Sequence, residues 1–140
     1  MIRRMACLVA AGLMLMPLAA RAQNASKEKA GVAAAEKWLG LVDKGEYAAS
    51  WKDAASSFRA QVPEQKWTKM AQSVRGPLGK LMTRKLAKEA YRSSLPGAPD
   101  GQYVVLEFVT AFANKKSAVE TVATVLDKDG KWRVVGYFIR

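Results

Sequence analysis

Three segments near the C-terminus decide the fold: QYVVLEFVTAFA (102–113), SAVETVATVLD (117–127) and KWRVVGYFIR (131–140). They are short and rich in valine, threonine, phenylalanine and tyrosine, which is typical of β-strands. Residues 114–116 join the first two segments, and Asp129-Gly130 joins the second and third as a strong hairpin signal. The pattern therefore predicts three antiparallel strands that follow one another in a meander.

The first connection lies in FANKKSAVETV (112–122), where two adjacent lysines invite interpretation as a binding site. A hairpin turn explains it better, because Asn114 tolerates unusual backbone angles and Lys115 and Lys116 keep the tip in water. Glu120 follows inside an apolar run, and we expect it to face outward from the strand. The stretch is therefore interpreted as structural first.

The segment GKLMTRKLAKEAYRSS (79–94) fits either a helix or a strand. As a helix, it would place basic residues in an i, i+4 row opposite apolar ones. The proline- and glycine-rich loop SLPGAPDG (94–101) and the β-rich region beyond it favour a strand instead. We expect this strand to run from about Thr83 to Leu95.

Upstream, the apolar spacing changes to the helical period and predicts three amphipathic helices within residues 30–75. Their apolar stripes are Ala34, Trp38 and Leu41/Val42; Tyr47, Trp51, Ala54/Ala55, Phe58 and Val62; and Trp67, Met70/Ala71 and Val74. Gly45 is expected to end the first helix, Pro63 to start the third and Gly76-Pro77 to end it. The order predicts an α+β fold, with three N-terminal helices packed on one face of a curved, cone-like antiparallel sheet of about four strands.

The N-terminus predicts a cleaved signal peptide over residues 1–22. Arg3 and Arg4 precede an apolar run that is shorter than a membrane span needs, and Ala20-Arg21-Ala22 supplies the small-residue cleavage pattern. We therefore expect a periplasmic or secreted protein that begins at Gln23 and has no transmembrane segment after cleavage. A flexible lead-in is expected over 23–29 and a single domain over 30–140.

Composition restricts the chemistry of the exported chain. Three of the 23 basic residues and none of the 12 acids precede residue 23, so the net charge from there on is +8 instead of +11. Residues 23–140 contain no cysteine and no histidine. Serine or cysteine triads and the usual zinc sites are therefore excluded, and packing without disulfides must supply the stability. An enzyme is the less favoured hypothesis, and no cofactor or metal is expected.

Four residues are candidates for a ligand pocket: Trp51, Trp67, Tyr103 and Glu107. Aromatic side chains often line pockets, although core packing is the default for tryptophans on apolar helix stripes. A lone carboxylate inside a closed cavity would serve as an acid or base. Strand alternation nevertheless places Glu107 opposite the more apolar side of its segment, so we expect it to face outward.

Seven basic residues are candidates for anion binding: Lys80, Arg84, Lys85, Lys88, Arg92, Lys115 and Lys116. Such a cluster would attract anionic lipid or polysaccharide if the charges converged on one side. The competing interpretation is a solvated surface on which lysines protect the edges of the sheet. No fold signature of nucleic-acid binding is present, so nucleic acid is not an expected partner.

Several motifs resemble, in order, a family of short exported bacterial proteins known only as a domain of unknown function. They are RGPLG (75–79), SLPGAPDG (94–101), FANKKSAVETV (112–122) and DGKWRVVGYFIR (129–140), and the resemblance covers about residues 33–140. AAEKWLGLVDKGEYAASW (34–51) is more distantly similar to the start of nuclear-transport-factor-2-like (cystatin-like) domains. That similarity implies helices closing over a strongly bent sheet, and often a homodimer formed through the open sheet; neither resemblance implies a catalytic residue.

Three functions follow as hypotheses. The first is an exported, non-enzymatic domain that binds a small ligand or a protein partner of the cell envelope. The second is an envelope-associated protein whose basic face binds anionic lipid or polysaccharide. The third is a histidine-free hydrolase or isomerase that uses Glu107 or Glu120 with a tyrosine such as Tyr103.

Overall fold

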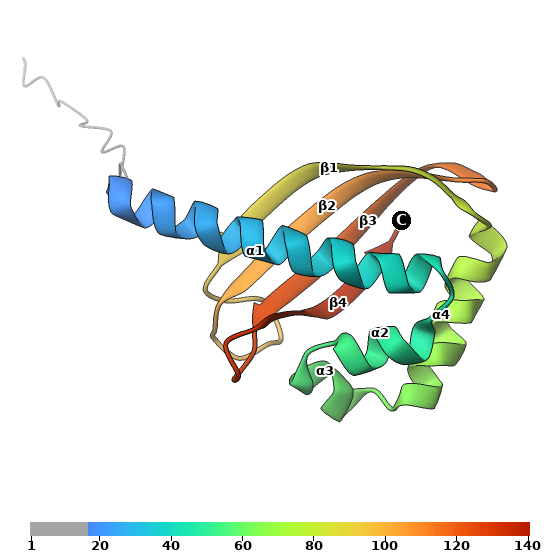
Figure 1. Ribbon diagram of the computed structural model, residues 1–140, viewed down its shortest axis with the longest axis horizontal. Helices are drawn as coiled ribbons and strands as arrows, with labels where there is room; N and C mark the ends of the chain where they lie inside the picture. The colour runs from blue at the N-terminus through green and yellow to red at the C-terminus, as the bar shows by residue number, and fades with distance from the viewer. Residues whose placement is uncertain (1–16) are drawn as a thin grey trace, which may run out of the picture.

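The C-terminal half forms a four-stranded antiparallel sheet in which the strands are neighbours in the order of the chain. The strands are β1 (Leu81–Arg92), β2 (Tyr103–Phe112), β3 (Lys115–Leu126) and β4 (Trp132–Ile139) (Figure 1). The structure is a computed structural model that describes residues 17–140, so the predicted basic and apolar parts of the signal peptide in residues 1–16 lie outside it. The meander and the choice of a strand for the ambiguous segment are confirmed, although β1 begins and ends two to three residues earlier than the predicted Thr83 and Leu95.

Four helices are described within residues 17–140, where three were predicted. They are α1 (Leu18–Asp43), α2 (Tyr47–Asp53), α3 (Ser56–Gln61) and α4 (Glu64–Leu78). The predicted second helix is divided at Ala54 and Ala55, which both have extended backbone angles. The Ala55 N–H donates to the carbonyl of Val134 in β4 at 2.8 Å, and Asp127 accepts hydrogen bonds from the backbone and hydroxyl of Ser56 at 2.9 and 2.7 Å. Bonds to the sheet thus interrupt a helical pattern that is locally continuous.

The ends of α1 and α4 differ from the predicted positions. α1 is already helical across residues 23–29, for which a flexible lead-in was expected, and it ends before Gly45 at φ 75° as predicted. α4 continues through Pro77 to Leu78 and stops at Gly79, whose φ of 73° suits glycine. No helix within residues 17–140 has both the length and the apolar character needed to cross a membrane.

All four helices lie on one side of the curved sheet (Figure 1). The buried core is formed by side chains of the helices and of the covered face of the sheet. Trp38, Leu39 and Val42 of α1 pack against side chains of β2, β3 and β4, among them Leu106 and Val122. A glycine allows this approach near the start of the interface: a Cβ built on Gly31 would lie 2.6 Å from the Cβ of Val104. The sheet therefore has one covered face and one open face.

The turn between β2 and β3 is tied to the end of α4. The Asn114 backbone N–H donates to Leu78 at 2.9 Å, and its Nδ2 donates to Pro77 at 3.1 Å. Asn114 does not have the unusual backbone angle that we expected, because the only positive φ angles in residues 17–140 belong to glycines. The asparagine is used for its side-chain amide, and Lys115 and Lys116 are exposed as predicted.

Candidate functional site

Glu120 is buried, and the prediction that it faces outward is wrong. Its relative exposure is 0%, and it lies on the covered face of the sheet because its cross-strand partner is the core residue Phe108. Paired residues on neighbouring antiparallel strands point to the same face. The charged group is therefore held in the core, where a carboxylate needs hydrogen-bond donors to be tolerated.

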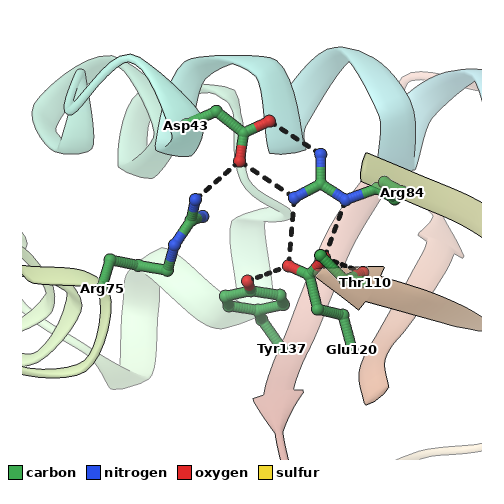
Figure 2. A network of polar contacts seen from close by, with 6 residues as sticks. All are labelled: Asp43, Arg75, Arg84, Thr110, Glu120 and Tyr137. Atoms are coloured by element: carbon green, nitrogen blue, oxygen red, sulfur yellow. Dashed lines mark hydrogen bonds and ion pairs between the residues drawn. The ribbon is translucent and has the colours of Figure 1, made fainter. Parts of the chain in front are cut away.

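Donors from three strands surround this carboxylate (Figure 2). Oε1 accepts hydrogen bonds from Arg84 Nε at 2.7 Å and from Thr110 Oγ1 at 2.6 Å. Oε2 accepts from Arg84 Nη2 at 3.2 Å and from the Tyr137 hydroxyl. Each carboxylate oxygen accepts two hydrogen bonds, so the site is organised to hold Glu120 rather than to present it to a substrate.

Arg84 bridges Glu120 to a second carboxylate at the end of α1. Its Nη1 and Nη2 donate to the two oxygens of Asp43 at 2.7 and 2.9 Å. Arg75, near the end of α4, donates from Nη2 to the same Asp43 Oδ1 at 2.8 Å. Figure 2 shows the resulting order of charges, Arg75–Asp43–Arg84–Glu120, which we call the buried ion network.

The pKa directions agree with this geometry. Burial alone would raise the pKa of Asp43, but hydrogen bonds and charges from Arg84 and Arg75 outweigh it and hold the pKa below its usual value. Burial acts to lower the pKa of Arg84, yet its two carboxylate partners raise it above the ordinary range. Burial, together with the charge and hydrogen bond of Glu120, raises the pKa of Tyr137 far above normal, so its hydroxyl remains a donor.

Arg75 has donors that the protein leaves unused. Its side chain is only 5% exposed, and neither Nε nor Nη1 has a hydrogen-bond partner within residues 17–140. The guanidinium carbon lies 4.8 Å from the centroid of the Phe112 ring, a cation–π contact that compensates part of the lost hydration. Buried donors without partners are costly and uncommon, so this position merits a functional explanation.

Arg75 also lines a cleft between α4 and the edge strand β4. The cleft has a volume of about 240 Å³, and we call it the α4–β4 cleft. Its lining residues are Trp67, Met70, Ala71, Val74, Arg75, Tyr137, Phe138 and Ile139. These residues are aliphatic or aromatic except for Arg75, which brings the one charged group. An apolar cleft with a few convergent polar groups is the usual form of a small-ligand site.

The four predicted pocket residues are not brought together. Trp67 lines the cleft, with its indole N–H bound to Ser50 Oγ at 2.9 Å, whereas the indole of Trp51 donates to Val62 at 2.7 Å elsewhere in the helical layer. Tyr103 is buried, and its hydroxyl donates to the carbonyl of Pro99 at 2.6 Å. Glu107 lies on the open face beside Lys88 and Arg140, in agreement with the prediction that it faces outward.

The predicted basic cluster is divided in the same way. Arg84 belongs to the buried ion network, so its assignment to a solvent-exposed anion site is corrected. The other six are exposed; Lys85, Lys88 and Arg92 follow β1, while Lys80, Lys115 and Lys116 lie near the β2–β3 turn and the start of β1. Within residues 17–140, no group of three or more acidic, cysteine or histidine side chains is placed to hold a metal ion.

Sequence reasoning missed Asp43, Arg75 and Tyr137. Trp67, Ala71 and Arg75 follow one another at intervals of four residues, which places the arginine on the buried stripe of α4. A charged residue in phase with an apolar stripe was the available signal. The partner Asp43 carries no comparable signal, because its contacts depend on how α1 and β1 meet.

Comparison with known families gives one result. A family model described as a protein of unknown function (DUF4019) matches residues 34–137. No curated protein and no solved structure gives a significant match.

Proposed function

The chain belongs to the DUF4019 family of proteins of unknown function, and on that premise we propose that it is an exported binding protein whose α4–β4 cleft takes a small amphipathic anion. The observation that carries the proposal is Arg75, a buried cation with two unpartnered donors in the lining of an apolar cleft. A carboxylate is the natural complement, since hydrogen bonds between a guanidinium and a carboxylate are charge-assisted. An ammonium head group offers no acceptor, and a neutral hydroxyl accepts these hydrogen bonds without the assistance of a charge.

The walls of the cleft suit a short apolar body. Met70, Val74 and Phe138 are 49%, 49% and 71% exposed, which is unusual for large apolar side chains that are near one another. A volume of about 240 Å³ is below the roughly 300–1,000 Å³ typical of drug-sized ligands. We therefore propose a short-chain aliphatic or aromatic carboxylate as the ligand class.

The buried ion network would hold the binding group in place before a ligand arrives. Asp43 fixes Arg75 through Nη2, and Arg84 fixes Asp43 through both carboxylate oxygens. A cation that is already oriented loses little conformational entropy on binding. Arg75 therefore contributes to affinity through its remaining donors while the network fixes its position.

A titration followed by NMR tests the proposal. Hexanoate, hexan-1-ol and hexylammonium share an apolar chain and differ in the head group. We expect hexanoate to shift the backbone resonances of Met70, Val74 and Phe138 and the Nε–Hε resonance of Arg75, with much smaller shifts for the other two compounds. Equal shifts with hexylammonium, or no saturable shift with hexanoate, would refute an anion site.

Matched variants on α4 separate the cleft from general charge effects. Val74→Glu places a carboxylate at the mouth of the cleft and is expected to abolish hexanoate binding by repulsion. Gln72→Glu adds the same charge on the exposed side of α4, outside the cleft, and is expected to bind hexanoate as the unmodified chain does. Because both positions are exposed, neither variant perturbs the core.

Export is proposed from the N-terminal pattern. The side chains of residues 17–22 are exposed or half-buried, so cleavage after Ala22 would remove the first turn of α1 without disturbing the core. Periplasmic fractionation followed by intact mass measurement tests this step. A protein beginning at Gln23 is expected, and a cytoplasmic chain with residues 1–22 retained would contradict it.

A further inference from the structure

The open face of the sheet combines an apolar centre with cationic edges. Its central residues come from β2 and β3 and include Val105, Val109, Val119, Ala123 and Val125. Phe138 of the edge strand β4 borders this face, next to the α4–β4 cleft that it also lines. All four helices lie on the opposite face (Figure 1), and Val109 and Phe138 remain 54% and 71% exposed. Exposed β-branched and aromatic side chains grouped on one face are typical of a surface that contacts a partner.

Strand register places the cations on this same face. On β1, Lys85 pairs with Val109, Lys88 with Glu107, and Arg92 with Tyr103. At the other edge, Arg140 exchanges two backbone hydrogen bonds with Val119. Cross-strand partners share a face, so Lys85, Lys88, Arg92 and Arg140 surround the apolar centre.

Negative charge on this face is small. Glu107 lies 3.7 Å from Lys88 Nζ and 3.6 Å from Arg140 Nη2, and these two cations are 78% and 72% exposed. One carboxylate is therefore shared between cations from opposite edges of the sheet. The remaining potential of the face is positive and favours a negatively charged partner.

We propose that this open face docks on the surface of a membrane that contains anionic phospholipid. The apolar centre would enter the boundary between headgroups and acyl chains, while the long basic side chains reach the phosphates around it. A second copy of the chain fits less well, because stacking two such faces would bring cationic edges together. An acidic polysaccharide would use the charges but not the apolar centre.

Vesicle co-sedimentation tests the proposal with the chain from Gln23 onward, since every buried residue in the described part of the chain lies at Gly31 or later. The probes are vesicles of phosphatidylcholine alone and of phosphatidylcholine with phosphatidylglycerol. We expect binding only to the second kind, weakening as salt screens the charges. Equal binding to both kinds, or none, would overturn the proposal.

Two charge-reversal variants separate the face from net charge. Lys85→Glu with Lys88→Glu is expected to weaken binding at least tenfold, because each basic residue near an anionic surface contributes roughly fivefold. Lys66→Glu with Lys69→Glu makes the same charge change on exposed positions of α4 and is expected to stay within about twofold of the unmodified chain. Equal loss in both variants would show attraction by net charge alone.

A third variant tests the apolar centre without changing charge. Val109→Ser is expected to weaken vesicle binding, and because Val109 does not line the α4–β4 cleft, hexanoate binding should be unchanged. Full vesicle binding by this variant would indicate an electrostatic partner such as an acidic polysaccharide and would overturn membrane docking. A dimer in sedimentation velocity that Val109→Ser dissociates would overturn it too, by assigning the face to a second copy.

Discussion

Replacing Glu120 by glutamine is the most direct test of the buried ion network. Glutamine keeps the shape of the side chain and removes its charge. It also introduces an amide donor where three neighbouring side chains already donate four hydrogen bonds. At least two hydrogen-bond donors would then point at each other inside the core, without an acceptor between them. Arg84 would keep Asp43 as its one ionic partner.

The expected magnitude follows from burial. Removing one member of a buried, hydrogen-bonded ion pair typically costs about 3–5 kcal/mol, because the other charge stays buried without compensation. The side chains of Glu120 and Arg84 are 0% and 13% exposed, so this range applies. We expect the Glu120→Gln variant to lose at least about 3 kcal/mol of unfolding free energy, a large share of the roughly 5–15 kcal/mol of an ordinary domain.

Glu107→Gln provides the matched control on the neighbouring strand. Its partners are 3.6–3.7 Å away and more than 70% exposed, and such surface pairs are worth about 0–1 kcal/mol. Urea unfolding of both variants, analysed at constant slope, measures the difference. If the two losses agreed within about 1 kcal/mol, which is less than the separation expected for buried and surface pairs, the network would not carry the stability assigned to it.

Three further results are expected. Tyr137→Phe removes one hydrogen bond to the Glu120 carboxylate and should lower the unfolding free energy by roughly 1.5–3 kcal/mol in the same urea assay; a neutral change would contradict that bond. Gly31→Ala should destabilise by about 1–3 kcal/mol, because its Cβ would lie 2.6 Å from Val104 Cβ, whereas Gly40→Ala in the same helix meets no atom within 4 Å and should stabilise by up to about 1 kcal/mol. Asp127 has a pKa of about 2, held low first by the Ser56 backbone N–H, against about 3.9 in an unfolded chain. Its stabilising contribution is therefore complete above about pH 4 and is lost as the pH falls toward 2. Asp127→Asn should flatten that part of the stability curve measured by urea titration, and an unchanged acid slope would count against this assignment.

The strand pattern and turn residues were enough to predict the meander, but not the face on which Glu120 lies. Both sides of β3 are largely apolar. From the sequence alone, the side with Val119, Thr121, Ala123 and Val125 is the better candidate for the core-facing side, because the other side carries the charge of Glu120. The hairpin register decides otherwise, since Phe108 is buried and pairs directly with Glu120. The register shifts by one residue between Thr110 and Phe112, so extending the turn pairing of Phe112 with Lys115 would have placed Glu120 opposite Glu107, on the open face.

The divided helix and the α4–β4 cleft depend on contacts that local patterns do not contain. Ala54 and Ala55 continue a helical apolar stripe, yet a hydrogen bond to Val134, distant in the chain, draws Ala55 out of the helix. Arg75 was detectable as a charge in phase with the buried stripe of α4. Its cleft was not, because the facing wall comes from β4 and depends on how the helix meets the sheet.

The buried ion network also bears on how the chain folds. Together with Thr110 and Tyr137, which donate to Glu120, it takes one side chain from each of the four strands and one from each of two helices. Its bonds join residues 36 and 41 positions apart. A partly assembled chain with β4 undocked would leave Glu120 short of a donor in an apolar setting, and one without α1 would strip Arg84 of a counter-ion. Such intermediates are penalised by their own unpaired charges. The domain should therefore assemble in a single cooperative step, and late, once its distant segments have met.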